Sequence, residues 1–171
     1  MVLLDGRPVF CLNARDDYNP PFGVLDYIGW AVWAIGFGLE VTADRQKGAW
    51  RAVPTNAGKW IDVGLWSVSR HPNYFGEITL WCGAFLSCAS AFGTTPMWVS
   101  VISPFFVALL ICKLSGIPML ETRADEKWGG NAAYEAYKSE VPVLVPNPCV
   151  RRTGAPMPMA AADALTPIDP V

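Results

Sequence analysis

Uncharged and apolar residues gather in two long stretches, and a polar, basic segment separates them. The first stretch, residues 22–43, carries charges only near its ends, at Asp26 and Glu40. The second, residues 78–112, contains no charged residue. Because a helix rises about 1.5 Å per residue, the first stretch is long enough to cross the roughly 30 Å core of a bilayer. The pattern therefore predicts helices that cross a membrane.

The second stretch has the pattern of a helical hairpin, because Gly, Thr and Pro at residues 92–96 break it near its middle. Each arm is short for a membrane span unless residues 74–76 and 113–116 are included. Pro104 is expected to kink the second arm. A buried hairpin in a soluble protein is the alternative interpretation. With the first stretch, the arms predict an all-α, polytopic integral membrane protein with about three transmembrane helices.

The rest of the chain divides around this membrane domain, residues 22–146. Residues 1–21 form an N-terminal lead without the pattern of a signal peptide, and its residues 13–21 are typical of turns. Residues 121–138 have the composition of an amphipathic helix interrupted at Gly129 and Gly130, and they predict a C-terminal surface helix. Residues 147–171 are predicted to be a disordered tail, because its last part is rich in Pro, Ala and Met without periodicity.

Composition and charge narrow the classes of function. Hydrophobic residues make up 52% of the chain, and eight tryptophans and five tyrosines suit the aromatic belts of a membrane protein. A net charge of −2 argues against nucleic acid as a partner. The five cysteines show no spacing typical of metal ligands, so no metal site is predicted.

The distribution of basic residues predicts how the chain is oriented in the membrane. Five lysines and arginines lie between the first span and the second, six follow the third, and the hairpin turn has none. The positive-inside rule then places residues 44–70 and the C-terminal region in the cytosol. Lys47 and Arg51 belong to this polar segment, which is either a solvated loop or a set of cations for the phosphates of a nucleotide.

A nine-residue segment, SRHPNYFGE at residues 69–77, stands where the basic segment meets the uncharged stretch. Pro72 suits the first position of a helix, so a helix is predicted to begin there. The free N–H groups of its first turn, beside Arg70 and His71, would suit a phosphate or a carboxylate. The alternative is that these residues only anchor the helix at the headgroups.

Glu77 follows Asn73 by four residues, so the two side chains are expected to share one face of this helix. A carboxylate at membrane depth is costly and faces a cavity or a polar partner far more often than lipid. Glu77 is therefore a candidate functional residue. The alternative interpretation is a glutamate that extends to the interface or pairs with a neighbouring lysine.

Several segments resemble the steroid 5-alpha-reductase C-terminal family, to which the sterol reductases are more distantly related. They are GLWSVSRHPNYFGEITLWCGAF at residues 64–85, EVTADRQK at 40–47, GIPMLE at 116–121 and YEAYKSEVPVLVP at 134–146. The isoprenylcysteine methyltransferases share the RHPxYxG core. Asn73 and the pair Gly76-Glu77 favour the reductase branch.

This resemblance implies a membrane-embedded, NADPH-dependent reductase that acts on a carbon–carbon double bond in a steroid-like or other lipid enone. It implies that Glu77 is the catalytic acid that polarises the substrate carbonyl. The residues that it assigns to the cofactor are Lys47, Arg51, Arg70, His71, Asn73, Tyr74, Arg123, Asp125, Tyr134 and Tyr137. The expected partners are a lipid substrate and the bilayer of the endoplasmic reticulum or of a bacterial inner membrane, with the site facing the cytosol.

Two other functions stay open. One is an S-adenosylmethionine-dependent methyltransferase of a lipid or an isoprenylcysteine, with Glu121, Arg70 and His71 at the methyl donor. The other is a truncated, non-catalytic membrane subunit. Family members carry additional N-terminal membrane helices, so the resemblance implies missing N-terminal helices, a partner subunit that completes the site, or a lost activity.

Overall fold

The computed structural model of the protein describes residues 21–89 and 101–150, and this part of the chain is helical, without strands. The helices are α3 (Val24–Ala52), α4 (Pro72–Ala89), α6 (Ile102–Leu109), α7 (Ile117–Trp128) and α8 (Ala132–Glu140). Short 3-10 turns cover Pro54–Asn56 and Gly64–Ser67. The predicted N-terminal lead, the hairpin turn at residues 92–96 and most of the predicted tail lie outside the described residues.

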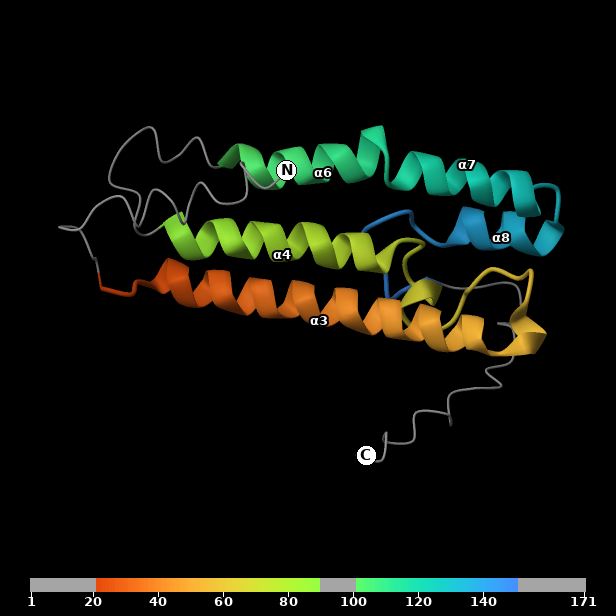
Figure 1. Ribbon diagram of the computed structural model, residues 1–171, viewed down its shortest axis with the longest axis horizontal. Coiled ribbons are helices and arrows are strands. Elements are labelled where there is room, and N and C mark those ends of the chain that lie inside the picture. The colour runs from red at the N-terminus through yellow and green to blue at the C-terminus, as the bar shows by residue number, and fades with distance from the viewer. Residues whose placement is uncertain (1–20, 90–100, 151–171) are drawn as a thin grey trace, which may run out of the picture.

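The long helices lie side by side, with α4 between α3 and the row formed by α6 and α7 (Figure 1). α3 and α4 run in opposite directions, and α6 reverses the direction again. Val107, Ile111 and Ile117 form a buried cluster on the α6–α7 side, against which Tyr74 and Trp81 of α4 pack. The all-α fold predicted from the sequence is confirmed.

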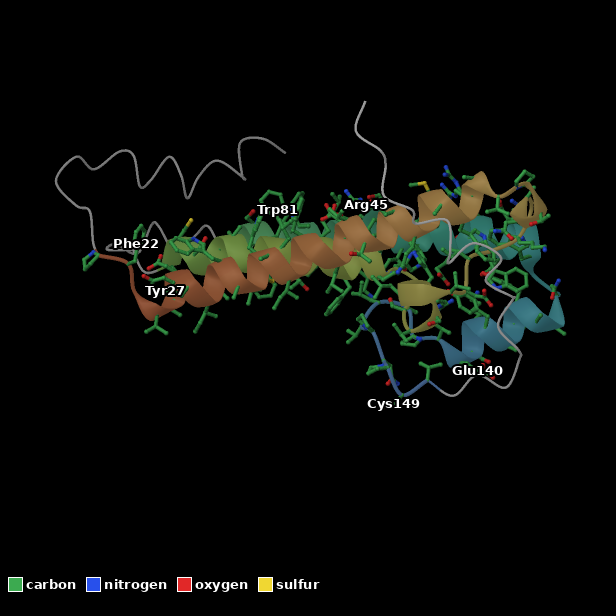
Figure 2. The ribbon with its side chains drawn as sticks, turned by 90° about the horizontal axis from the view of Figure 1, so that it is seen from below. Phe22, Tyr27, Arg45, Trp81, Glu140 and Cys149 are labelled. Carbon is green, nitrogen blue, oxygen red and sulfur yellow. The ribbon has the colours of Figure 1, made fainter. Side chains whose placement is uncertain are left out.

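Two of the described helical stretches are long and apolar enough to cross a membrane, α3 and the run Ile102–Trp128. In α3, only 17% of the apolar stretch is buried within the protein, and in Ile102–Trp128 only 28% is. Neither is therefore the core helix of a soluble protein, which would be mostly buried. Phe22 and Tyr27 are exposed at the end of α3 opposite to Glu140 (Figure 2). The fold is that of an all-α membrane protein, in which α4, the second of the three expected spans, lies between these two stretches (Figure 1).

The polar segment after the first span differs from its prediction. The sequence pattern places the end of the helix near Ala43, but α3 continues to Ala52. Lys47 and Arg51 are therefore helical residues rather than loop residues. The helix stops at Val53 because Pro54 follows, and proline disfavours the helical conformation of the residue before it.

The expected kink at Pro104 is also corrected. Pro104 lies at the start of α6, where a missing N–H costs no helical hydrogen bond. The irregular backbone comes later, in the π-helical turn Leu110–Leu114 and the two residues that follow it. The interruption predicted at Gly129 and Gly130 is found, since α7 ends at Trp128 and α8 begins at Ala132.

One end of the molecule gathers the polar elements. The last turns of α3, the loop that leads to α4, the end of α7 and α8 all lie there (Figure 1). After α8, the chain returns along the residues before α4: the N–H of Arg70 donates to the carbonyl of Pro142 at 2.9 Å, and the N–H of Asn147 donates to that of Val68 at 2.9 Å. Both basic segments of the sequence are thus at the same end.

Candidate functional site

α4 begins at Pro72, as the sequence predicts. The hydroxyl of Ser69 donates to the carbonyl of Leu144 at 2.8 Å and accepts from the N–H of His71 at 3.2 Å. Ser69 is fully buried and His71 is 6% exposed. The residues before α4 are therefore held in place by the chain that follows α8, and the direction of the His71 side chain is fixed.

Glu121 joins the two basic side chains before α4. Its carboxylate accepts a hydrogen bond from Nη1 of Arg70 at 2.5 Å and lies 2.7 Å from Nε2 of His71. The three side chains are largely buried, with exposed fractions of 10% for Arg70, 8% for His71 and 20% for Glu121. A charge-assisted hydrogen bond at this depth fixes the arginine more firmly than a surface ion pair would.

A cavity of about 460 Å³ opens beside this group, at the polar end of the molecule. Six cationic side chains line it, from α3, the following loop, the residues before α4 and α7. They are Lys47, Arg51, Lys59, Arg70, Arg123 and Lys127. Glu121 is the carboxylate among the lining residues, and it is already paired with Arg70. The cavity therefore offers an excess of positive charge to an anionic ligand.

The cavity brings together seven of the residues that the resemblance assigns to a cofactor. These are Lys47, Arg51, Arg70, His71, Arg123, Tyr134 and Tyr137. Tyr74 is not a lining residue but stacks on the His71 ring with the centroids 5.7 Å apart. Asp125 is outside the lining too, and bonds to Lys138. Asn73 lies apart and donates to Asp44 at 3.2 Å.

Glu77 does not line the cavity. It lies one turn beyond Asn73 on α4, half-buried, and interacts electrostatically with Glu40 and Asp44 of α3. It also interacts with Tyr74, which stacks on the cavity-lining His71. Glu77 is therefore displaced from the cavity along α4, toward the membrane-embedded part of the helix pair.

Four tryptophans in the cavity wall were missed by the sequence reasoning. Trp50, Trp60, Trp66 and Trp128 all line the cavity. The ammonium of Lys47 lies 4.7 Å from the ring centroid of Trp66, and that of Lys127 lies 4.7 Å from the centroid of Trp128. For Trp50, Trp60 and Trp66, the interleaving with Lys and Arg in residues 47–66 was the signal that could have found them, and Trp128 directly follows Lys127.

Tyr134 completes the wall from α8. Its ring meets that of Trp60 edge to face, with centroids 5.4 Å apart, and its hydroxyl donates to Asp125 at 3.2 Å. Burial, together with the charges of Asp125 and Glu121, raises the pKa of Tyr134 to about 12. The phenol is therefore a neutral hydrogen-bonding group at physiological pH.

The fold and the site define a class: an all-α membrane protein that carries a cationic, tryptophan-walled cavity at one polar end. Comparison with protein families narrows this class to one family. The model of the family described as "Protein of unknown function (DUF1295)" matches residues 2–141, and the chain belongs to this family. The family is part of the steroid 5-alpha-reductase-like group.

One relative among curated proteins is a Delta(14)-sterol reductase of Ascobolus immersus. The two are 31% identical over 131 residues, which cover 64% of this chain and 30% of the relative. The matched region therefore spans less than a third of the relative's length. No solved structure gives a significant match.

Proposed function

We propose that the protein is an NADPH-dependent reductase of a carbon–carbon double bond in a membrane lipid such as a steroid or another enone. The observation that carries the proposal is the convergence of cations from four segments of the chain on one cavity. A sterol reductase among the relatives supports the reaction class. Within the steroid 5-alpha-reductase-like group, the segments at residues 64–85 and 134–146 favour the C-terminal reductase family.

The residues that line the cavity suit NADPH. Lys47 and Arg51 lie four residues apart on α3, so both reach the same side, where they would bind phosphates. Arg70, held by Glu121 at 2.5 Å, is a fixed donor at the entrance to α4. The tryptophan and tyrosine rings of the wall would pack against the flat rings of the cofactor. Once bound, the cofactor supplies the hydride.

Glu77 would then act on the lipid rather than on the cofactor. Its place on α4, one turn from Tyr74 and toward the apolar part of the helix, suits contact with a substrate that enters from the bilayer. A hydrogen bond from the Glu77 carboxyl group to the substrate carbonyl would stabilise the negative charge that develops on that oxygen. The site would face the cytosol, where residues 44–70 and α8 are placed by the positive-inside rule.

A second candidate rests on Glu121. In it, Glu121, which contacts Arg70 and His71, would lie at the methyl donor, and its carboxylate would bind the ammonium group of S-adenosylmethionine. The excess of cations around the cavity favours the phosphate-bearing NADPH instead, because S-adenosylmethionine carries no phosphate.

Ligand protection separates the candidates. The detergent-solubilised protein is heated with NADPH, with S-adenosylmethionine, or with neither. A ligand at a hundred times its dissociation constant raises the free energy of unfolding by about 2.7 kcal/mol. We expect protection by NADPH alone. Protection by S-adenosylmethionine alone would establish the methyltransferase, and protection by neither would favour a non-catalytic subunit.

A further inference from the structure

Three N–H groups beside the cavity are buried and have no hydrogen-bond acceptor within the described residues. They are Nε1 of Trp50, Nε1 of Trp60 and Nε of Arg70. All three residues line the cavity. Trp50 is 7% exposed, and the Arg70 side chain is 10% exposed. Since a buried donor without an acceptor costs free energy, each such group in a native protein calls for a specific partner.

The other two tryptophans of the wall are different. Nε1 of Trp66 donates to the carbonyl of Ala43 at 3.0 Å, and Nε1 of Trp128 donates to the carbonyl of Gly58 at 2.6 Å. These two indoles tie the wall together. The indoles of Trp50 and Trp60 have no such bond, although they line the same cavity. N–H groups without an acceptor are therefore found at Trp50 and Trp60, and not at every tryptophan of the wall.

The charges around these donors indicate what accepts their hydrogen bonds. Lys47 and Arg51 flank Trp50 in the sequence of α3, and Lys59 precedes Trp60. Arg70 uses Nη1 for Glu121, which leaves its Nε–H for another acceptor. Cations that line the same cavity as these N–H donors favour an acceptor that is both anionic and rich in oxygen, which describes a phosphate group.

We propose that Trp50, Trp60 and Arg70 donate hydrogen bonds to the phosphate oxygens of a nucleotide in this cavity. This proposal rests on the proposed function only in taking that nucleotide to be NADPH. Trp50 and Trp60 are then binding residues that recognise the ligand through their indole N–H groups. Trp66 and Trp128 have a structural role.

The experiment measures thermal unfolding of the full chain in detergent with three probes: inorganic pyrophosphate, adenosine 2′,5′-bisphosphate and NADPH. Trp50→Phe and Trp60→Phe are compared with Trp66→Phe and Trp128→Phe, which make the same change in size at the same cavity. We expect the first pair to weaken binding about ten- to a hundredfold, the range for losing a hydrogen bond to a charged group. The second pair should lower the unfolding temperature without ligand and change affinity much less.

An isosteric replacement separates the N–H group from the ring. Benzothienylalanine at position 50 keeps the size of tryptophan but replaces the N–H with sulfur. We expect it to weaken the probes as strongly as Trp50→Phe does and to leave ligand-free stability unchanged. Arg70→Lys, which keeps the charge but loses Nε–H, should weaken them as well.

The outcomes distinguish this inference from the proposed function. If NADPH protects the parent and the position 50 and 60 variants equally, the inference is wrong and the reductase proposal stands. If pyrophosphate binding depends on Trp50 while NADPH does not bind, the phosphate site stands and the reductase proposal fails. If no probe protects the parent, the inference is overturned.

Discussion

At the scale of single residues, Glu121 connects two parts of the chain that lie some fifty positions apart. Its carboxylate meets Arg70 and His71 at 2.5 and 2.7 Å, and all three side chains are largely buried. The methyltransferase alternative groups Glu121 with Arg70 and His71 at one site, but nothing in the pattern around residue 121 predicts that their side chains contact one another directly. Such a pairing depends on how α7 packs against α4, and that is a property of the fold.

Glu121→Gln should destabilise the protein, because Arg70 loses the charged acceptor that holds it. We expect a loss of about 1.5–3 kcal/mol in the free energy of unfolding, the range for hydrogen bonds to charged groups. Glu126→Gln is the matched control, since it makes the same change at an exposed carboxylate on the same helix. That variant should unfold close to the parent. Equal losses would show that the Arg70 contact contributes no special stability.

Glu77→Gln separates chemistry from cofactor binding. An acid that only polarises a substrate carbonyl contributes to the transition state and little to the bound nucleotide, so NADPH affinity should stay within a few-fold. Enone reduction should fall about a hundred- to a thousandfold. His71→Ala, at the cavity, should weaken NADPH itself. NADPH affinity and the rate of enone reduction are measured on the same preparation of each variant. A Glu77→Gln variant that reduces the enone as fast as the parent contradicts the proposed role of Glu77.

At the scale of elements, the sequence predicts helix boundaries where proline or glycine marks them, as at Pro72 and Gly129, but not the end of α3. Pro72 begins α4 as expected, because proline fixes its own backbone and needs no N–H in the first turn. The end of α3 was placed near Ala43 because charges begin there. The helix nevertheless continues to Ala52, since Trp50 and Trp66 pack at the polar end and bury one face of the extra turns. Tertiary packing of this kind leaves no periodic signal in the sequence.

Glycines set the distance between α3 and α4. A Cβ atom at Gly36 would lie 2.7 Å from the carbonyl oxygen of Gly76, and one at Gly76 would lie 2.6 Å from the backbone nitrogen of Glu40. A side chain at either position would therefore push the two backbones apart. The sequence shows the glycines, but only the packed helices show which of them face a neighbour.

Gly36→Ala should destabilise the helix pair by about 1–3 kcal/mol, the usual cost of overpacking. Gly38→Ala is the control on the same helix, since a Cβ atom there meets nothing within 4 Å. That change should be neutral or stabilising by up to about 1 kcal/mol, because alanine favours a helix over glycine. The comparison is made by thermal unfolding in detergent. Equal effects at the two positions would mean that α3 and α4 do not touch as described.

At the scale of the whole molecule, the two basic segments of the sequence meet at one end of the helices (Figure 1). The charge pattern predicts a shared side of the membrane, and the fold accounts for it by placing α8 beside the loop that follows α3. The resemblance assigned seven of the cavity-lining residues to one cofactor, but the tryptophan wall and Lys59 and Lys127 were not predicted, because only the fold brings their segments together.

This arrangement predicts a topology. Cysteines introduced at Lys59 and Lys138 should both react with an impermeant thiol reagent from the cytosolic side, and the protein should stay with membranes through an alkaline carbonate wash. A control cysteine at Val24, at the opposite end of α3, should not react from that side. Labelling of positions 59 and 138 from opposite sides would contradict the shared polar end.

The central claim is that the cationic cavity binds NADPH. The most direct test is to titrate NADPH into two variants in which an arginine is replaced by glutamate. Arg51 lines the cavity, whereas Arg45 is an exposed arginine on the same helix that does not line it (Figure 2). Arg51→Glu should weaken NADPH about tenfold or more, since it replaces a charge-assisted donor with a repelling carboxylate. Arg45→Glu should leave the dissociation constant within about twofold, because an exposed charge outside the cavity is screened by salt. Equal affinities for the two variants, whether both weakened or both unchanged, would contradict NADPH binding in this cavity.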